Sequence, residues 1–421
     1  MKIGIIGLGY VGLPLVIQFA KSGAQVLGID VDETKVNALN AGESYIKHIP
    51  AAEVRVQRDA GQIEATTDYA RVKELDAVLI CVPTPLGDKR EPDLTYILNT
   101  ARAIAPHLPK DIVVVLESTT YPGTTEDELR PILETGSGLK AGNDFYLAYS
   151  PEREDPGNPG SQVAKIPKVI GGYTPTCLEK AKTVYSIAIE ALVPVSSCRA
   201  AEATKLLENI FRCVNIALVN EMKIIYHELG IDIWEVIEAA KTKPFGFMPF
   251  YPGPGLGGHC IPIDPFYLSW KAKQHGLEAR FIELAGEVNT AMPDYVIGRC
   301  KEVLNSYGKK IEGSRILVLG LAYKANVDDD RESPSYVLME KLEAKGAMVE
   351  YHDPYIQVIK SSRDHSQYAG RKSCEPSSSF DLFLLATHHD IYREMGLEKY
   401  GVPVVDTRHI VTAPSSNWFF A

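Results

Sequence analysis

The sequence lacks the cysteine patterns and apolar runs that mark several special classes of protein. Its seven cysteines are an odd number, with no Cys-x-x-Cys pair and no metal-type spacing. This argues against a disulfide framework and against a metal site, and it favours a reducing, cytoplasmic location. No apolar run approaches the roughly 20 residues that cross a bilayer. The chain opens directly on an apolar strand, so we expect no signal peptide and no membrane partner.

Positive charge is also scarce. The chain has 44 Lys and Arg against 54 Asp and Glu, a formal net charge of −10. We therefore expect no nucleic-acid partner, because binding to a phosphate backbone depends on basic residues. Small anionic ligands remain possible, since helix N-termini and a few local basic groups can hold them. With 421 residues the chain is expected to form two or three domains.

What the sequence does contain is a cysteine in a glycine-rich loop. Residues 253–264 read GPGLGGHCIPID, which sets Cys260 beside His259 and four residues before Asp264. Glycines let backbone approach a ligand closely, and a polar, partly exposed setting favours the nucleophilic thiolate. A buried structural cysteine is the alternative. The other cysteines are interpreted as packing residues: Cys81, Cys177, Cys198, Cys213, Cys300 and Cys374.

A second motif opens the chain. An apolar run from residue 2 ends at Gly7-x-Gly9-x-x-Gly12, a helical pattern follows, and a second apolar run ends at Asp30. Strand, glycine turn, helix, strand and acid in this order are the dinucleotide-binding fingerprint. Gly7 would make the tight turn, Gly9 would admit the pyrophosphate, and Gly12 would let helix pack on strand. An acid at position 30 would bind ribose hydroxyls and favours NAD over a 2′-phosphorylated cofactor.

The first part of the chain alternates strands with helices, which predicts a doubly wound parallel sheet. The expected strands are residues 2–6, 25–29, 76–82, 112–116, 145–149 and 168–171. Three of them end in polar, proline-containing loops, which begin at Cys81, Glu117 and Ser150. Ligands bind at the carboxyl edge of such sheets, so these loops predict one site.

A long helical pattern then runs from about residue 200 to 229 without Gly or Pro. Such a helix between two α/β halves predicts a spine or a dimer surface, and Lys205 and Asn209 lie one turn apart on it. Further helices are expected from residue 231, over 266–275 and over 281–305.

The last part repeats the first: the runs beginning at Arg315, Ala347 and Asp381 echo those beginning at Lys2, Ala24 and Asp76. A last strand is expected at residues 402–408. The second and third fingerprint glycines are replaced by Ala322 and Ala325, so we expect a different ligand or pose. We thus predict two Rossmann-like domains, 1–198 and 309–421, joined by a helical dimerisation domain, 199–308, in a homodimer or higher homo-oligomer.

Together these residues resemble the nucleotide-sugar dehydrogenases, the UDP-glucose/GDP-mannose dehydrogenase family, over essentially the whole chain. Their motifs here are the fingerprint and the runs VPTP (82–85), STTYPGT (118–124), SPER (150–153), AEATKLLEN (201–209), GGHCIPID (257–264) and 324–333. The resemblance implies NAD as cofactor, a UDP-sugar as substrate and a role in polysaccharide biosynthesis. The amino-terminal domain would bind NAD and the carboxy-terminal one the nucleotide of the sugar.

Within the family the chain most resembles the N-acetylhexosamine branch. Residues 250–271 are similar to those of UDP-N-acetylglucosamine 6-dehydrogenases, whereas UDP-glucose enzymes tend to have Gly-Gly-Ser-Cys in this loop. The UDP-glucose enzymes also have a second acid after the Ser-Pro-Glu acid, where this chain has Pro156. UDP-N-acetylglucosamine is therefore the expected substrate, with UDP-glucose and UDP-N-acetylmannosamine as alternatives.

The resemblance also implies a mechanism, a four-electron oxidation of C6 from alcohol to carboxylate that uses two NAD. Cys260 would form a thiohemiacetal and then a thioester. Lys205 and Asn209 would stabilise the oxyanion, Asp264 and Glu152 would act on water, and Thr119 would hold water or cofactor. The alternatives are a solvated Lys205, a turn-forming Asp264 and a Glu152–Arg153 loop salt bridge.

The remaining expected contacts follow from the same resemblance. The predicted cofactor-binding residues are Gly7, Gly9, Tyr10, Val11, Gly12, Asp30, Lys35, Pro83, Thr84, Ser118, Thr119 and Arg331. The predicted substrate-binding residues are Glu152, Arg153, Lys205, Asn209, Tyr251, Gly253, Gly255, Gly257, Gly258, His259 and Lys324. Lys324 and Arg331 would face phosphates, although a charged loop of this kind can also be a solvated surface.

Two alternative hypotheses for the function lie outside this family. In one, the chain is a two-electron NAD-dependent hydroxy-acid dehydrogenase and Cys260 is structural. In the other, it is a regulatory protein that binds NAD and turns nothing over.

Overall fold

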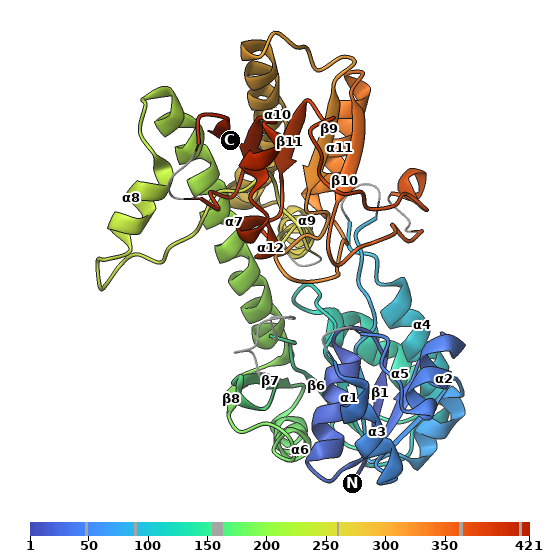
Figure 1. Cartoon of the computed structure of the whole chain (residues 1–421). Coiled ribbons are helices and arrows are strands. Elements are labelled where there is room, and N and C mark those ends of the chain that lie inside the picture. The colour runs from blue at the N-terminus through green and yellow to red at the C-terminus, as the bar shows by residue number, and fades with distance from the viewer. Residues whose placement is uncertain (47–48, 88–90, 154–162, 259–260, 362–364, 412–414) are drawn as a thin grey trace. The chain divides into compact units, whose positions relative to one another are not determined.

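Two sheets carry the fold, one in each of two units. The computed structural model describes every residue except 47–48, 88–90, 154–162, 259–260, 362–364 and 412–414 (Figure 1). Over the described residues, the first unit comprises residues 1–208 and 266–278, and the second comprises 209–265 and 279–421.

The described residues of the first unit form an eight-stranded sheet in the order β3-β2-β1-β4-β5-β6-β7-β8. Its strands are β1 Lys2–Ile6, β2 Gln25–Ile29, β3 Ile63–Thr66, β4 Ala77–Ile80, β5 Val113–Leu116, β6 Tyr146–Tyr149, β7 Lys168–Gly172 and β8 Leu192–Val195. The chain order reverses between β1 and β4, as in the doubly wound fold that the sequence predicts. The crevice at that reversal, outside the carboxyl ends of the strands, is where such sheets bind ligands.

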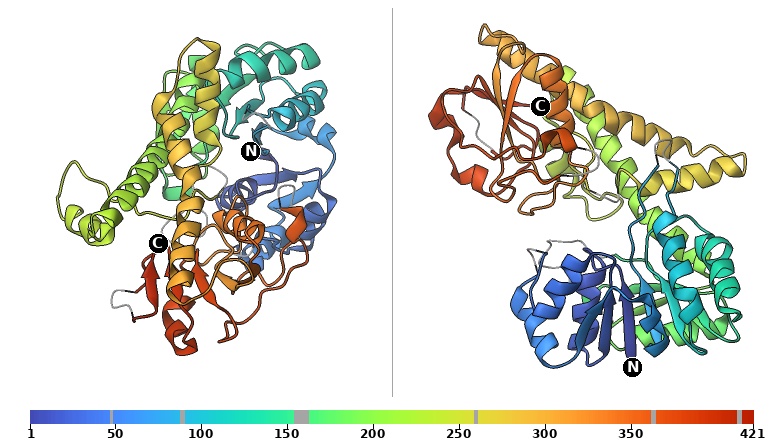
Figure 2. Two further views of the ribbon diagram at one scale, coloured as in Figure 1. Left: turned by 90° about the horizontal axis from the view of Figure 1, so that it is seen from above. Right: turned by 90° about the vertical axis from the view of Figure 1, so that its right-hand side faces the viewer.

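Helices cover both faces of this sheet (Figure 2, right). They are α1 Gly12–Lys21, α2 Glu33–Ala41, α3 Ala51–Asp59, α4 Thr95–Ile104, α5 Arg130–Ser137 and α6 Pro175–Tyr185. The central strands β4 and β5 are consequently buried along their whole length, which is why their sequences are continuous apolar runs.

One strand pair departs from the predicted parallel arrangement, because β7 runs antiparallel to β6. A parallel return requires a crossover connection, commonly a helix. Between β6 and β7 the described residues contain only the short helical turn Val163–Lys165. The edge strands β3 and β8, which are four residues each, were not predicted.

The helical region consists of α7 Cys198–Glu228, α8 Ile233–Ala240, α9 Asp264–Gln274 and α10 Arg280–Ser306. The predicted long helix is thus present, and the division between the two units falls within it. In the second unit α7 and α10 are joined by a buried hydrogen bond of 2.8 Å from Asn220 Nδ2 to Asn289 Oδ1. An apolar cluster that includes Cys213, Ala217 and Ala285 packs beside it.

The described residues of the second unit form a five-stranded parallel sheet in the order β10-β9-β11-β12-β13. Its elements are β9 Arg315–Leu319, α11 Pro334–Ala344, β10 Met348–His352, β11 Leu382–Leu385, α12 Ile391–Glu394, β12 Val404–Asp406 and β13 Trp418–Phe420. The expected last strand at 402–408 is not the last, because β13 follows it.

The internal repeat extends to the turn that follows the first strand of each sheet. The amide of Gly7 donates to Ile29 O at 2.8 Å, and the amide of Gly320 donates to His352 O at 2.8 Å. Both glycines adopt positive φ, +92° and +89°, a conformation that residues with a Cβ rarely adopt.

Candidate active site

The glycine turn between β1 and α1 has the shape that a dinucleotide requires. A Cβ on Gly7 would lie 2.7 Å from the carbonyl oxygen of Cys81, and one on Gly12 would lie 1.8 Å from the carbonyl oxygen of Gly7. A Cβ on Gly9 would meet no described atom within 4 Å. Gly7 and Gly12 are therefore fixed by packing, while Gly9 faces open space where a pyrophosphate could approach the backbone.

The acid at the end of β2 supports this turn. Asp30 Oδ2 accepts the Leu8 amide at 2.7 Å, and Oδ1 accepts the Asp32 amide at 3.0 Å. Lys35 Nζ lies 3.5 Å from Oδ2. A carboxylate has about four acceptor positions, so Asp30 can hold the turn and still accept ribose hydroxyls. These residues fit NAD.

The start of α1 adds a favourable field for phosphate. Tyr10 and Val11 lie half-buried just before the helix, and the described first turn carries no acidic side chain. The positive end of the helix dipole is therefore left for an anionic ligand.

The loops after β4 and β5 meet at the carboxyl edge of the sheet. Ser118 Oγ donates to Val82 O at 2.7 Å and so ties the two loops together. Thr84 is buried, and its carbonyl oxygen accepts the hydroxyl of Tyr267 on α9. Pro83 is exposed and Thr119 is half-buried at this edge.

A buried carboxylate that was not predicted from the sequence holds the rest of the loop after β5. Glu202 on α7 accepts the Gly123 amide at 2.6 Å, the Thr125 amide at 2.9 Å and the Thr125 hydroxyl at 2.7 Å. Burial raises the pKa of Glu202 to about 7, although these donors act to lower it. The sequence signal for Glu202 was its place in the run AEATK, where it lies within one helical turn of Lys205.

The loop after β6 brings two predicted catalytic residues together. Lys205 on α7 is buried, and its Nζ donates to the carbonyl oxygen of Glu152 at 2.6 Å, so the alternative of a solvated lysine was wrong. The carboxylate of Glu152 lies 3.2 Å from Lys168 Nζ. The guanidinium of Arg153 pairs with Glu208 at 2.7 Å.

In the second unit, Asn209 and Asp264 form a buried pair. Asn209 Nδ2 donates to Asp264 Oδ2 at 2.6 Å, and the two residues are 4% and 1% exposed. Asp264 is the first residue of α9, so it both opens a helix and holds a polar partner. The predicted nucleophile Cys260 and its neighbour His259 lie outside the described residues.

The glycine-rich loop before Cys260 packs against its own unit. The Gly253 amide donates to Asn220 Oδ1 at 3.0 Å. Cβ atoms on Gly257 and Gly258 would lie 3.1 Å from Tyr323 Cβ and 2.8 Å from Tyr323 Cε2. Close packing of the loop on Tyr323 is therefore a reason for these two glycines besides ligand binding.

Two further loop residues were predicted to contact the sugar. Tyr251 is 41% exposed, donates to Glu238 Oε1 at 2.8 Å and stacks on Trp234 with ring centroids 5.6 Å apart. Gly255 has φ +142°, so this position favours glycine whatever it binds.

The carboxyl edge of the second sheet differs from that of the first in the contacts of the acid that follows the second strand. Asp353, the counterpart of Asp30, accepts the amides of Leu321 and Ala322 at 2.7 and 2.9 Å and lies 3.0 Å from His389 Nε2. Its other oxygen accepts the Tyr355 amide at 2.8 Å. Its acceptor positions are thus taken by its own chain, which supports a different ligand pose in this half.

The charged loop after β9 carries Lys324 and Arg331, the two residues that were predicted to face phosphates. Arg331 donates to Asp329 Oδ1 at 2.8 Å and Oδ2 at 2.6 Å, and its side chain is 47% exposed. Lys324 is half-buried.

The fold and the turn geometry define a dinucleotide-binding domain. It is followed by a second Rossmann-like sheet, in which the acid after the second strand is occupied by groups of its own chain. Three family models match the chain: the UDP-glucose/GDP-mannose dehydrogenase family NAD binding domain at residues 1–189, central domain at 199–291 and UDP binding domain at 317–413. The chain belongs to this family. It is an NAD-dependent nucleotide-sugar dehydrogenase, an oxidoreductase.

Relatives of stated activity match nearly the whole chain. UDP-N-acetyl-D-glucosamine 6-dehydrogenase of Pseudomonas aeruginosa is 35% identical over 94% of this chain and 93% of its own. UDP-N-acetyl-D-mannosamine dehydrogenase of Escherichia coli K12 is 40% identical over 80% of this chain and 81% of its own. The solved UDP-D-ManNAc dehydrogenase of Pyrococcus horikoshii matches with a TM-score of 0.90 at 32% identity, covering 100% of this chain and 98% of that one. Among the helices of the described residues, none is long and apolar enough to cross a bilayer.

Proposed function

We propose that the protein oxidises C6 of UDP-N-acetylglucosamine to the uronic acid in two steps, with two NAD. The observation that carries this proposal is the pairing of the predicted catalytic side chains within each unit. Lys205 is held on the Glu152 carbonyl, and Asn209 is held on Asp264. Buried, paired polar groups of this kind are pre-organised, which is what stabilisation of a developing oxyanion requires.

Each step has a stated role for a residue of this chain. When bound, NAD accepts a hydride from C6 in each of the two oxidations. Lys205 takes part in removal of the hydroxyl proton and stabilises the oxyanion together with Asn209. Cys260 thiolate adds to the aldehyde, and the resulting thiohemiacetal loses a proton and a hydride to become a thioester. A water activated by Glu152 or Asp264 then displaces the thiolate and leaves the carboxylate.

UDP-N-acetylmannosamine is a second candidate substrate. The loop of residues 250–271 favours the glucosamine epimer, and the Pseudomonas relative with that activity spans nearly the whole chain. The relative at 40% identity, however, acts on the mannosamine epimer. The two sugars differ only in configuration at C2, so few contacts distinguish them.

We also propose that two copies pair through the helical domain, residues 199–308, between the NAD-binding domain 1–198 and the nucleotide-sugar domain 309–421. On α7 the apolar residues Phe211, Leu218 and Ile225 recur every seven residues and are 47%, 51% and 43% exposed. Phe281 and Leu284 on α10 are 76% and 56% exposed. Large exposed apolar stripes mark protein interfaces. The six described cysteines carry free thiols, which supports a cytoplasmic location.

The substrate assignment is tested by comparing the two epimers directly. Purified enzyme with excess NAD receives limiting UDP-N-acetylglucosamine or UDP-N-acetylmannosamine, and NADH is followed by absorbance. We expect kcat/KM at least tenfold higher for the glucosamine epimer. A ratio of the opposite sense would assign the mannosamine epimer, and turnover of neither would remove both candidates.

A further inference from the structure

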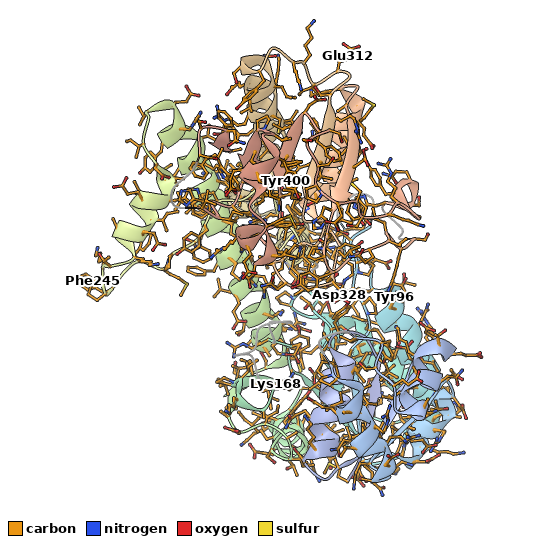
Figure 3. The ribbon with its side chains drawn as sticks, in the orientation of Figure 1. Tyr96, Lys168, Phe245, Glu312, Asp328 and Tyr400 are labelled. Atoms are coloured by element: carbon orange, nitrogen blue, oxygen red, sulfur yellow. The ribbon has the colours of Figure 1, made fainter. Side chains whose placement is uncertain are left out.

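A buried lysine joins Glu152 to a second carboxylate in the first unit. Lys168 Nζ lies 2.6 Å from Glu117 Oε2 and 3.2 Å from Glu152 Oε2. The three side chains are 5%, 0% and 15% exposed. The hydroxyl of Tyr185 donates to the other oxygen of Glu117. Figure 3 labels Lys168, which begins β7.

The charges in this cluster keep Lys168 protonated. Burial acts to lower the pKa of Lys168, but the carboxylates of Glu117 and Glu152 raise it above its ordinary value. Burial raises the pKa of Glu117, which Lys168 counteracts. A buried charge is tolerated when it is paired in this way, so the ammonium is a permanent feature of the folded unit.

The strand that carries Lys168 is fixed in the sheet. The Lys168 amide donates to Ala191 O at 2.9 Å. The next residue, Val169, accepts the hydroxyl of Ser150 at 2.8 Å. The loop of residues 150–153 is therefore attached to β7 at two points, through Ser150 and through the carboxylate of Glu152.

We infer that Lys168 is a positioning residue, which orients Glu152 for thioester hydrolysis. This inference rests on the proposed function. Glu152 Oε1 accepts the Arg153 amide at 2.7 Å while Oε2 faces Lys168. The same residue holds Lys205 Nζ through its carbonyl oxygen at 2.6 Å. Lys168 thus orients the carboxylate of Glu152 and, through the loop, the carbonyl oxygen that holds Lys205.

The chemistry of the final step explains why an ammonium is suited to this place. A general base must be ionised and must point at the proton that it removes. A nearby cation favours the ionised carboxylate. In the hydrolysis Glu152 takes a proton from water, the oxygen of that water bonds to C6, and the C6–sulfur bond breaks with its electron pair on the Cys260 thiolate. Lys168 itself forms no bond and donates no proton.

The test uses the full-length enzyme with Lys168→Met. Because this change leaves Glu117 buried without its ammonium, a second variant, Lys168→Met with Glu117→Gln, removes that charge as well. Lys182→Met is the matched control, because among the described residues the side chain of Lys182 makes only an exposed pair with Glu179 at 2.9 Å. NAD affinity verifies that each variant is folded.

Rapid mixing with UDP-N-acetylglucosamine and NAD is expected to give a burst approaching two NADH per active site in both Lys168 variants. Steady-state turnover should then be at least 30-fold slower than in the wild type, because hydrolysis follows both oxidations. Mass spectrometry of the quenched enzyme should show the sugar attached to Cys260. The acid limb of the kcat profile should move to higher pH, and Lys168→Arg should restore part of the rate.

Wild-type kcat and an unchanged pH profile in the folded double variant would overturn the inference, as would a slow first NADH with no burst. Neither result touches the proposed function as long as the wild type yields two NADH per sugar. One NADH per sugar in the wild type would remove the proposed function, and the inference with it.

Discussion

Lys223 is a buried lysine whose Nζ makes no hydrogen bond among the described residues, and its replacement should stabilise the protein. Its side chain lies on α7 in the second unit and is 4% exposed. Its Nζ lies over the ring of Tyr295, 5.9 Å from the ring centroid, a weak contact at this distance. Burial lowers the pKa of Lys223 from 10.5 to about 7, while Asp406 acts to raise it.

The magnitude follows from this change in proton affinity. A tenfold change is worth about 1.4 kcal/mol, so the buried ammonium costs on the order of 5 kcal/mol well below pH 7. The folded pKa lies below the unfolded one, so stability of the wild type rises with pH between about 7 and 10.5 and is lost as the pH falls through that window. In Lys223→Met this slope disappears, and at pH 8 the variant should be more stable by about 3 kcal/mol.

Urea unfolding followed by hydrogen exchange and mass spectrometry measures this effect unit by unit. Peptides from α10 report on the second unit, and peptides from α1 serve as an internal reference. The same substitution at Lys301, which is exposed on α10, is the control and should change stability by less than about 0.5 kcal/mol. A variant that is less stable than the wild type at pH 8, or a difference that does not shrink towards pH 10, would refute the reasoning.

Three further outcomes are expected. Gly9→Ala should leave thermal stability unchanged, because its Cβ would meet no described atom within 4 Å. The same change should weaken NAD binding at least tenfold in calorimetry, and unchanged affinity would contradict the pyrophosphate assignment. Asn209→Leu should lower kcat by about 10²–10³-fold with NAD affinity retained, because it removes the donor to Asp264 and to the oxyanion. A kcat within threefold of the wild type would exclude a role of Asn209 in stabilising the oxyanion. Phe211→Glu with Leu218→Glu should yield monomers in light scattering, and a persisting dimer would place the interface elsewhere.

The sequence predicted best where local pattern and burial agree. The strands 2–6 and 25–29 coincide with β1 and β2, because each is a short apolar run that ends at a glycine or an acid. The strands β3 and β13 were missed, since IEAT and WFF are too short to show a period. The reversal of β7 was also missed, because strand direction depends on the connection and not on the strand itself.

The candidate site divides in the same way. The fingerprint and the Lys205–Asn209 spacing are local patterns, so the sequence alone indicated them. The buried charged residues Glu117, Lys168 and Glu202 come from separate segments of the chain. Their ion pairs and hydrogen bonds form only when the fold brings these segments together. A lysine at the start of an apolar strand was the available signal for Lys168, but its pairing with Glu117, 51 positions earlier, is a tertiary contact that no local pattern encodes.

The central claim is that Cys260 carries a four-electron oxidation. The most direct test is the NADH formed at completion from limiting UDP-N-acetylglucosamine and excess NAD, in the wild type, in Cys260→Ala, and in Cys300→Ala as a control at a buried helical cysteine. The account predicts two NADH per sugar for the wild type and the control, and no uronic acid from Cys260→Ala. One NADH per sugar in the wild type, or undiminished acid formation by Cys260→Ala, would contradict it.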